Sequence, residues 1–102
     1  MIGNWIYEEN ALPFFEVLAN IVGYNFDSDD WTTLEQGIKA SDLSAEPQKW
    51  FDYNFDKMSF SVGQDHGSSV IELCIDAPKQ YKQSIRTVFD IMSYYRVSRE
   101  TS

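Results

Sequence analysis

The chain has 102 residues, is 43% hydrophobic and 16% aromatic, and carries a formal net charge of −8. Its length fits one domain, and its composition argues against disorder and against binding of nucleic acid or anionic membranes through a basic surface. Residues 1–56 hold eleven of the sixteen acids and two bases, a net charge of −9, which favours a basic partner.

The ends and the cysteine content bear on the compartment. The first residues lack the basic and apolar segments of a secretion signal, and no stretch approaches the roughly 18 apolar residues of a membrane span. The single cysteine, Cys74, cannot form an internal disulfide. We therefore expect one cytoplasmic domain over residues 1–102, without a membrane partner.

Residues 10–22 predict a first helix. Asn10 is a suitable N-cap, Pro13 is tolerated in the first turn and Gly23 can end the helix. Apolar residues recur at helical spacing and on both sides of the main stripe, namely at Leu12, Phe14, Phe15, Leu18, Ala19, Ile21 and Val22. Such a helix is expected to be central and covered on two faces.

A second helix is predicted to begin at Asp27-Ser28-Asp29-Asp30, where a capping side chain precedes acids in the first turn. Its buried face is expected to hold Trp31, Leu34 and Ile38. Gly37 is expected to weaken its end, and residues 40–49 to form a surface connection.

From Trp50 the apolar residues alternate with polar ones. Residues 50–55, 58–62 and 70–75 each show the two-residue period of a strand. Residues 54–57 and the glycine-containing segment 63–68 are predicted turns between them. Three consecutive strands joined by short turns predict an antiparallel meander.

A last amphipathic helix is predicted to begin at Asp76 or Ala77, with Pro78 in its first turn. Its apolar residues are Tyr81, Ile85, Val88, Phe89, Met92 and Tyr95. The predicted architecture is therefore α+β, with two N-terminal helices, a three-stranded antiparallel meander and a C-terminal amphipathic helix packed on the sheet.

Candidates for catalysis and metal binding are few. His66 beside Asp65 could act as a general base, but a solvated turn residue is the stronger interpretation. Asp27, Asp29 and Asp30 do not continue into an EF-hand loop, and Cys74 has the pattern of a strand residue, not of a reactive thiol. We expect no enzyme activity, no catalytic residue, no metal and no cofactor.

The segment Trp50-Phe51-Asp52-Tyr53-Asn54-Phe55-Asp56 alternates aromatic and acidic side chains. Alternation places Trp50 and Asp52 on the face opposite Phe51 and Phe55. Trp50 beside carboxylates could anchor a partner rich in Lys or Arg, or it could pack beneath a loop. The sequence leaves both alternatives open.

Several features together resemble the small immunity proteins that bacteria encode beside contact-dependent growth-inhibition and other polymorphic toxins. They are the acidic composition, the aromatic strand from Trp50 to Phe55, the hairpin across Gly67-Ser68-Ser69 and the closing helix that ends in Tyr94-Tyr95. The resemblance implies a protein that binds one cognate toxin, commonly a basic nuclease, and neutralises it by covering its active site. It carries over no binding residue.

The acids and the aromatic strand give the candidate partner-binding residues, which are Asp27, Asp29, Asp30, Trp50, Asp52 and Asp56. A regulatory or adaptor binding module, including a phage-type mimic of nucleic acid, is the alternative from another class. A small enzyme using Asp65 and His66 is the third hypothesis. The immunity protein and the binding module are expected to bind neither nucleic acid nor a small-molecule substrate.

Overall fold

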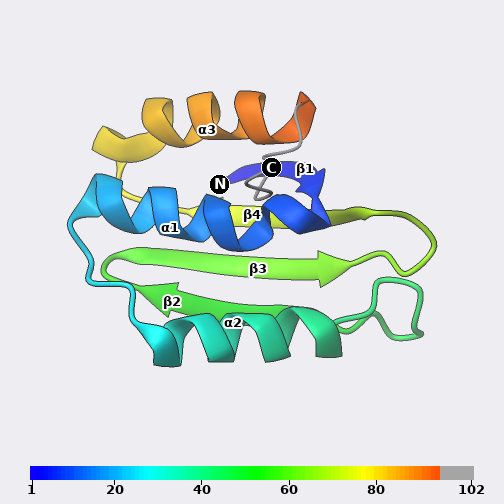
Figure 1. Ribbon diagram of the computed structural model, residues 1–102. Helices are drawn as coiled ribbons and strands as arrows, with labels where there is room; N and C mark the ends of the chain where they lie inside the picture. The colour runs from blue at the N-terminus through cyan, green and yellow to red at the C-terminus, as the bar shows by residue number, and fades with distance from the viewer. Residues whose placement is uncertain (95–102) are drawn as a thin grey trace, which may run out of the picture.

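The computed structural model describes residues 1–94 and shows an α+β fold, drawn in Figure 1. In the described part the sheet has four antiparallel strands in the order β1-β4-β3-β2. The elements in chain order are β1 (Ile2–Tyr7), the short 3-10 turn η1 (Glu8–Asn10), α1 (Ala11–Val22), α2 (Ser28–Ala40), β2 (Phe51–Phe55), β3 (Met58–Gln64), β4 (Val70–Asp76), the 3-10 turn η2 (Lys79–Tyr81) and α3 (Lys82–Tyr94).

The predicted meander is present as β2, β3 and β4, but the prediction of a three-stranded sheet is wrong. The first residues form β1, which pairs with β4 through Ile2 opposite Ile75 and Ile6 opposite Ile71. Ile2 and Ile6 are buried, whereas Asn4 between them is exposed. That polar residue interrupts the apolar alternation, so these residues lack a clear strand pattern.

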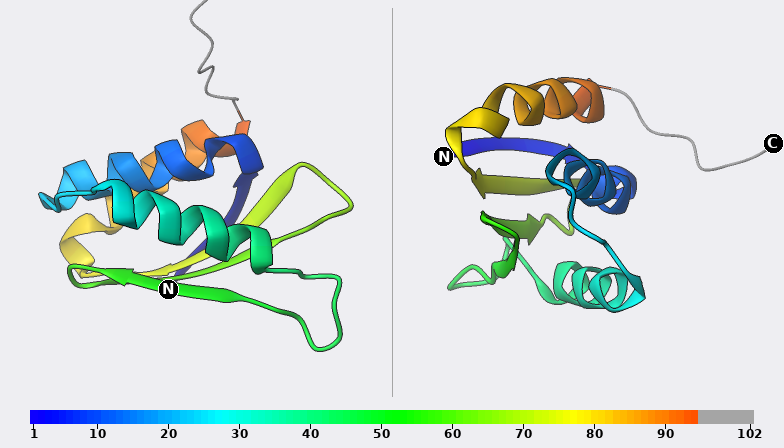
Figure 2. Two further views of the ribbon diagram at one scale, coloured as in Figure 1. Left: turned by 60° about the horizontal axis from the view of Figure 1, so that its bottom comes forward. Right: turned by 90° about the vertical axis from the view of Figure 1, so that its left-hand side faces the viewer.

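α1 and α2 cover one side of the sheet, and α3 lies along β1 at its edge (Figures 1 and 2). α1 lies between the other two and contacts both, as expected of a central helix. Its Phe15 ring packs on Phe60 of β3 with centroids 4.9 Å apart, and its Phe14 ring packs on Phe89 of α3 at the same distance. α2 lies against β2 and β3.

The last helix differs from its prediction in start and in position. Asp76 ends β4, and α3 begins at Lys82 after the turn η2. Its main sheet contacts are with β1 at the edge of the sheet, and not with the middle strands. The Ser93 hydroxyl donates a 2.7 Å hydrogen bond to the Trp5 carbonyl oxygen, which satisfies an outward-pointing group of this edge strand. The predicted apolar position Tyr95 lies outside the described residues.

Asn10 occupies the N-cap position of α1, as predicted, but its side chain does not cap the helix. Its side chain makes no hydrogen bond to the first turn of the helix. Its side-chain nitrogen Nδ2 instead donates a 2.9 Å hydrogen bond to the carbonyl oxygen of Met92. Asn10 is fully buried, so this bond satisfies a polar group in the core and ties the start of α1 to the end of α3.

Gly37 has a packing role that its helix propensity does not suggest. A Cβ atom at this position would lie 2.3 Å from the ring of Phe51 in β2. The missing side chain therefore lets α2 approach β2 closely. Phe51 is held from its other side by Tyr53, with ring centroids 6.0 Å apart.

Substituting Gly37 by alanine tests this contact. At a helix position with no neighbour close by, replacing glycine by alanine would raise the free energy of unfolding by about 1 kcal/mol. Here we expect overpacking against Phe51 to reverse the sign, with a net loss of about 1–3 kcal/mol in the free energy of unfolding. Urea denaturation measures it, with Gln36→Ala on the exposed face of α2 as the control. A stabilised Gly37→Ala protein would contradict the close approach.

Candidate functional site

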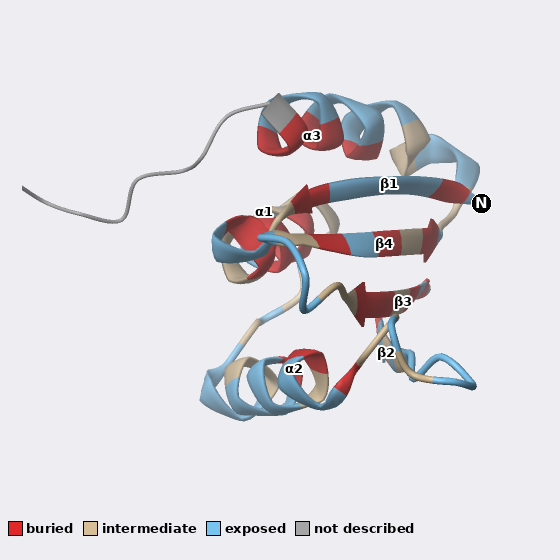
Figure 3. Ribbon diagram, turned by 90° about the vertical axis from the view of Figure 1, so that its right-hand side faces the viewer, coloured by how far each residue is buried: buried red, intermediate tan, exposed pale blue. Residues whose placement is uncertain are grey.

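The side of the sheet away from α1 and α2 is the candidate functional surface. Residues that point there alternate with the buried ones along β4, as its colouring in Figure 3 shows. Leu43, in the loop before β2, packs over Gly63 on this face, where a Cβ atom would meet its side chain. We call the following residues the open sheet face: Trp5, Trp50, Asp52, Ser61, Glu72, Cys74 and Asp76.

Strand register brings these residues together from distant parts of the sequence. Asp52 pairs with Ser61, and Ser61 pairs with Cys74, so the three form one row across β2, β3 and β4. Trp5 of β1 pairs with Glu72 of β4 in a neighbouring row. Paired residues in an antiparallel sheet project to the same side.

A shallow depression lies in this face and is lined by Met1, Trp50, Asp52, Ser61 and Cys74. We call it the Trp50 hollow. The Ser61 hydroxyl donates a 2.8 Å hydrogen bond to Asp52 Oδ1, which holds the carboxylate beside the strand. Trp50 is 36% exposed, so its placement favours the partner-anchor alternative over packing beneath a loop.

The electrostatics of the open sheet face are one-sided. Asp52, Glu72 and Asp76 are all exposed, and the outward-facing strand positions include no Lys or Arg. Trp5 is 47% exposed beside Glu72. Two large aromatic rings among exposed carboxylates form a surface that suits a cationic protein partner.

Cys74 forms part of this face as a small apolar side chain. It is partly buried, and burial followed by the nearby charge of Glu72 raises the pKa of its thiol. A raised pKa reduces the thiolate fraction at neutral pH, which is opposite to the environment of a reactive cysteine.

The acids at the start of α2 divide into structural and exposed ones. Asp27 and Asp30 form a capping box. The Asp30 N–H donates a 3.0 Å hydrogen bond to Asp27 Oδ1, and the Asp27 N–H donates a 3.2 Å hydrogen bond to Asp30 Oδ2. Asp30 also accepts the hydroxyls of Tyr24 and Tyr53. Asp29 is exposed.

These bonds change the titration of Asp30. Partial burial acts to raise the pKa of its carboxyl, but the hydrogen bonds from Tyr53, Asp27 and Tyr24 outweigh burial and lower it. Burial, followed by the hydrogen bond to Asp30, raises the pKa of the Tyr53 hydroxyl. Asp30 therefore holds α2 to β2 as an ionised acceptor.

The six predicted partner-binding residues thus do not form one cluster. Trp50 and Asp52 line the Trp50 hollow. Asp27 and Asp30 serve the fold, and Asp56 is exposed in the β2–β3 turn with a φ of 54°. The prediction missed Trp5, Glu72 and Asp76, because their shared face depends on the unpredicted strand β1 and on long-range register.

Asp65 and His66 do not form an oriented acid–base pair. The Asp65 carboxylate accepts the Gly67 N–H at 3.0 Å and the Ser68 hydroxyl at 3.2 Å. His66 is exposed and its Nε2 lies 3.1 Å from the carbonyl oxygen of Ser41. Both side chains are thus engaged in stabilising loops.

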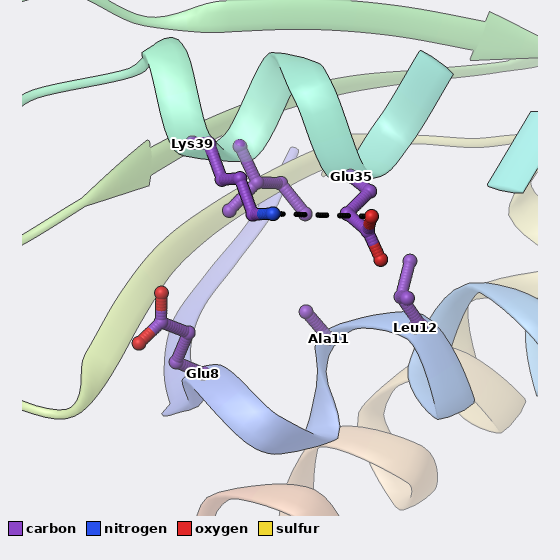
Figure 4. A pocket seen from close by; sticks show the side chains of 6 residues that line it. Glu8, Ala11, Leu12, Glu35 and Lys39 are labelled. Carbon is purple, nitrogen blue, oxygen red and sulfur yellow. Dashed lines mark ion pairs between the residues drawn. The ribbon is translucent and has the colours of Figure 1, made fainter. Parts of the chain in front are cut away.

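A second cleft lies between the start of α1 and α2 (Figure 4). Ala11 and Leu12 form one wall, and Glu35 and Lys39 form the other, with Lys39 Nζ 3.9 Å from Glu35 Oε1. Its volume is about 110 Å³, well below the roughly 300–1,000 Å³ of small-molecule sites. We therefore assign no ligand to it.

Within residues 1–94 no three His, Cys, Asp or Glu side chains are grouped so that they could hold a metal ion. No helix in the same range has the length and apolar character needed to cross a bilayer. Comparison with family models, curated proteins and solved structures gave no match to this chain.

Asp30→Asn tests the structural role of Asp30. We expect a loss of about 1–2 kcal/mol in the free energy of unfolding near neutral pH, because a cap and two phenol contacts weaken. The folded pKa lies below the ordinary 3.8, so ionised Asp30 stabilises the fold above about pH 4, and this contribution disappears as the pH falls through the folded value. The difference in the free energy of unfolding between wild type and Asp30→Asn should therefore become smaller below about pH 4.

Urea denaturation at several pH values measures this difference. Asp29→Asn is the matched control, since Asp29 is the exposed neighbour, and it should leave stability nearly unchanged. Equal effects of the two substitutions would contradict the role of Asp30.

Proposed function

We propose that this protein is an immunity protein that binds a cognate toxin and neutralises it by covering its active site. A basic nuclease is the expected toxin. The observation that supports this most directly is the open sheet face, where Trp5 and Trp50 lie among Asp52, Glu72 and Asp76 without a basic residue in the strands.

The chemistry of such a target explains the match. A nuclease site attracts phosphate with positive charge, so a surface that presents carboxylates can occupy it. Exposed indole rings supply the desolvated contact area that slows dissociation. The open sheet face combines both kinds of group on a rigid four-stranded support.

The proposed surface differs in part from the one that sequence suggests. Asp52 and Trp50 remain in it, and Glu72, Asp76 and Trp5 are added. Asp27 and Asp30 are left out because each is hydrogen-bonded within the α2 capping box. Asp56, exposed in the β2–β3 turn, stays at its margin and contributes long-range attraction, whereas Asp29 is exposed in the first turn of α2, away from this surface.

Acids outnumber bases in residues 1–56, which hold eleven acids and two bases. A net negative charge of this kind attracts an approaching basic protein. The proposed inhibitor acts in the cytoplasm, by binding alone, and requires neither metal nor cofactor.

The alternative of a nucleic-acid mimic is less well supported. A mimic needs carboxylates in a regular series at phosphate-like spacing, whereas here Trp5 and Trp50 interrupt the acids. An adaptor without a toxin partner would use the same open sheet face, and only the identity of the partner separates it from an immunity protein.

Coexpression with the toxin domain encoded at the same locus tests the proposed function. Wild type should restore growth, and Asp52→Lys and Glu72→Lys should restore it less well. Asp29→Lys, at an exposed acid away from the open sheet face, is the charge-matched control and should protect like wild type. Failure of wild type to protect would overturn the immunity role, and equal protection by all variants would overturn the assigned surface.

Binding kinetics give a second and independent test. The association rate should fall steeply between low and physiological salt, because exposed charges are screened beyond about 8 Å at 0.15 M. Surface plasmon resonance of wild type and Glu72→Lys measures it. A rate that is independent of salt would exclude steering by the acidic surface.

A further inference from the structure

The Trp50 hollow combines several kinds of side chain, whereas acids alone would be enough to attract a basic surface. An indole ring, a carboxylate, a hydroxyl and a thiol meet in it, from Trp50, Asp52, Ser61 and Cys74. β2 supplies Asp52, β3 supplies Ser61 and β4 supplies Cys74, so paired strands fix their relative positions. The hollow is therefore a built feature of the sheet.

Its polar groups have unused hydrogen-bonding capacity. Asp52 Oδ1 accepts the Ser61 hydroxyl at 2.8 Å. An ionised carboxylate offers about four acceptor positions, and this bond uses one of them. Within residues 1–94 no Lys or Arg side chain lines the hollow and Asp52 forms no ion pair, although Met1, which carries the terminal amino group, is also part of the lining.

Its aromatic group complements this charge. The Trp50 indole N–H donates to the Gln48 side-chain oxygen at 3.3 Å, which helps hold the ring, and the ring is 36% exposed. Tryptophan is the side chain whose ring face attracts cations most strongly. A cation beside both this ring and Asp52 gains two attractions at once.

We propose that the Trp50 hollow binds an arginine side chain of the partner, with the guanidinium against the Trp50 ring and its N–H groups donating to Asp52. Arginine fits better than lysine because a planar, weakly hydrated guanidinium stacks on an indole and pairs with a carboxylate through two N–H groups. Its methylene groups suit the apolar surface of Cys74. The presence of a partner rests on the proposed function, whereas the ligand chemistry rests on the hollow itself.

The test uses the full chain labelled with ¹⁵N and two short peptides, acetyl-Gly-Arg-Gly-amide and its citrulline counterpart. The three tryptophans supply three indole N–H signals as internal probes. The arginine peptide should shift the Trp50 signal in a saturable way and leave that of Trp31 in α2 unchanged. Citrulline has nearly the same shape as arginine but no charge. The affinity of the citrulline peptide should therefore be lower than that of the arginine peptide by a factor of about five or more.

Protein variants then separate a specific site from general attraction. Asp52→Asn should weaken binding of the arginine peptide by about two- to fivefold, as expected for an exposed ion pair. Asp29→Asn removes the same charge elsewhere and should leave binding unchanged. Amide signals of Ser61 and Cys74 should move with that of Trp50.

Three results would overturn the proposal. They are the absence of a Trp50 shift up to about 50 mM peptide, equal shifts of all indole signals, and equal weakening by Asp52→Asn and Asp29→Asn. Each leaves the toxin-rescue test untouched. Conversely, a saturable arginine-specific shift together with failed rescue would retain the hollow as an arginine site and reject the immunity role.

Discussion

Aromatic rings in contact run through the interior from α3 to the β2 edge of the sheet. Phe89 packs on Phe14, Phe14 on Phe15, Phe15 on Phe60, and Phe60 on Phe55, with centroid separations between 4.9 and 6.0 Å. Aromatic pairs at such separations contribute about 0.5–1.5 kcal/mol each beyond their buried area. This series joins α3, α1, β3 and β2 into one core, and the other features of the fold depend on it.

The ring contacts also decide what the opposite side of the sheet exposes. Phe55 and Phe60 must face the helices, and strand alternation then turns Asp52 and Ser61 outward. The same rule applied to β4 buries Leu73 and directs Glu72 and Cys74 to the open sheet face. The core thus fixes the positions of the proposed binding groups without contacting them.

The elements that sequence predicted are those with a strong local pattern. The buried faces of α1 and α2, the meander and the opposed faces of Phe55 and Asp52 follow from periodicity alone. β1 was missed because Asn4 interrupts its apolar alternation, and its pairing with β4 joins residues about seventy positions apart in the chain. The start of α3 was misplaced because Pro78 suits either a first helical turn or the 3-10 turn that precedes the helix.

The candidate site was half predictable for the same reason. Trp50 directly precedes β2 and Asp52 lies two residues later, so alternation places both on the same side. Glu72 joins them through the predicted pairing of β3 with β4, whose register was not predicted, and Trp5 joins only through the pairing of β4 with β1, for which the sequence carries no local signal. Gly37 likewise appears as a weak helix residue until the ring of Phe51 is seen against it.

Acidic residues in this protein therefore have two separable physical roles. Asp30 is ionised to accept hydrogen bonds from Tyr24, Tyr53 and the Asp27 backbone, and its charge is used within the fold. Asp52 accepts one hydroxyl and keeps most of its acceptor positions toward solvent. A net charge of −8 does not distinguish the two, but hydrogen-bond partners do. Because the two sets lie on different elements, binding can be altered at Asp52 while Asp30 continues to hold α2 against the sheet.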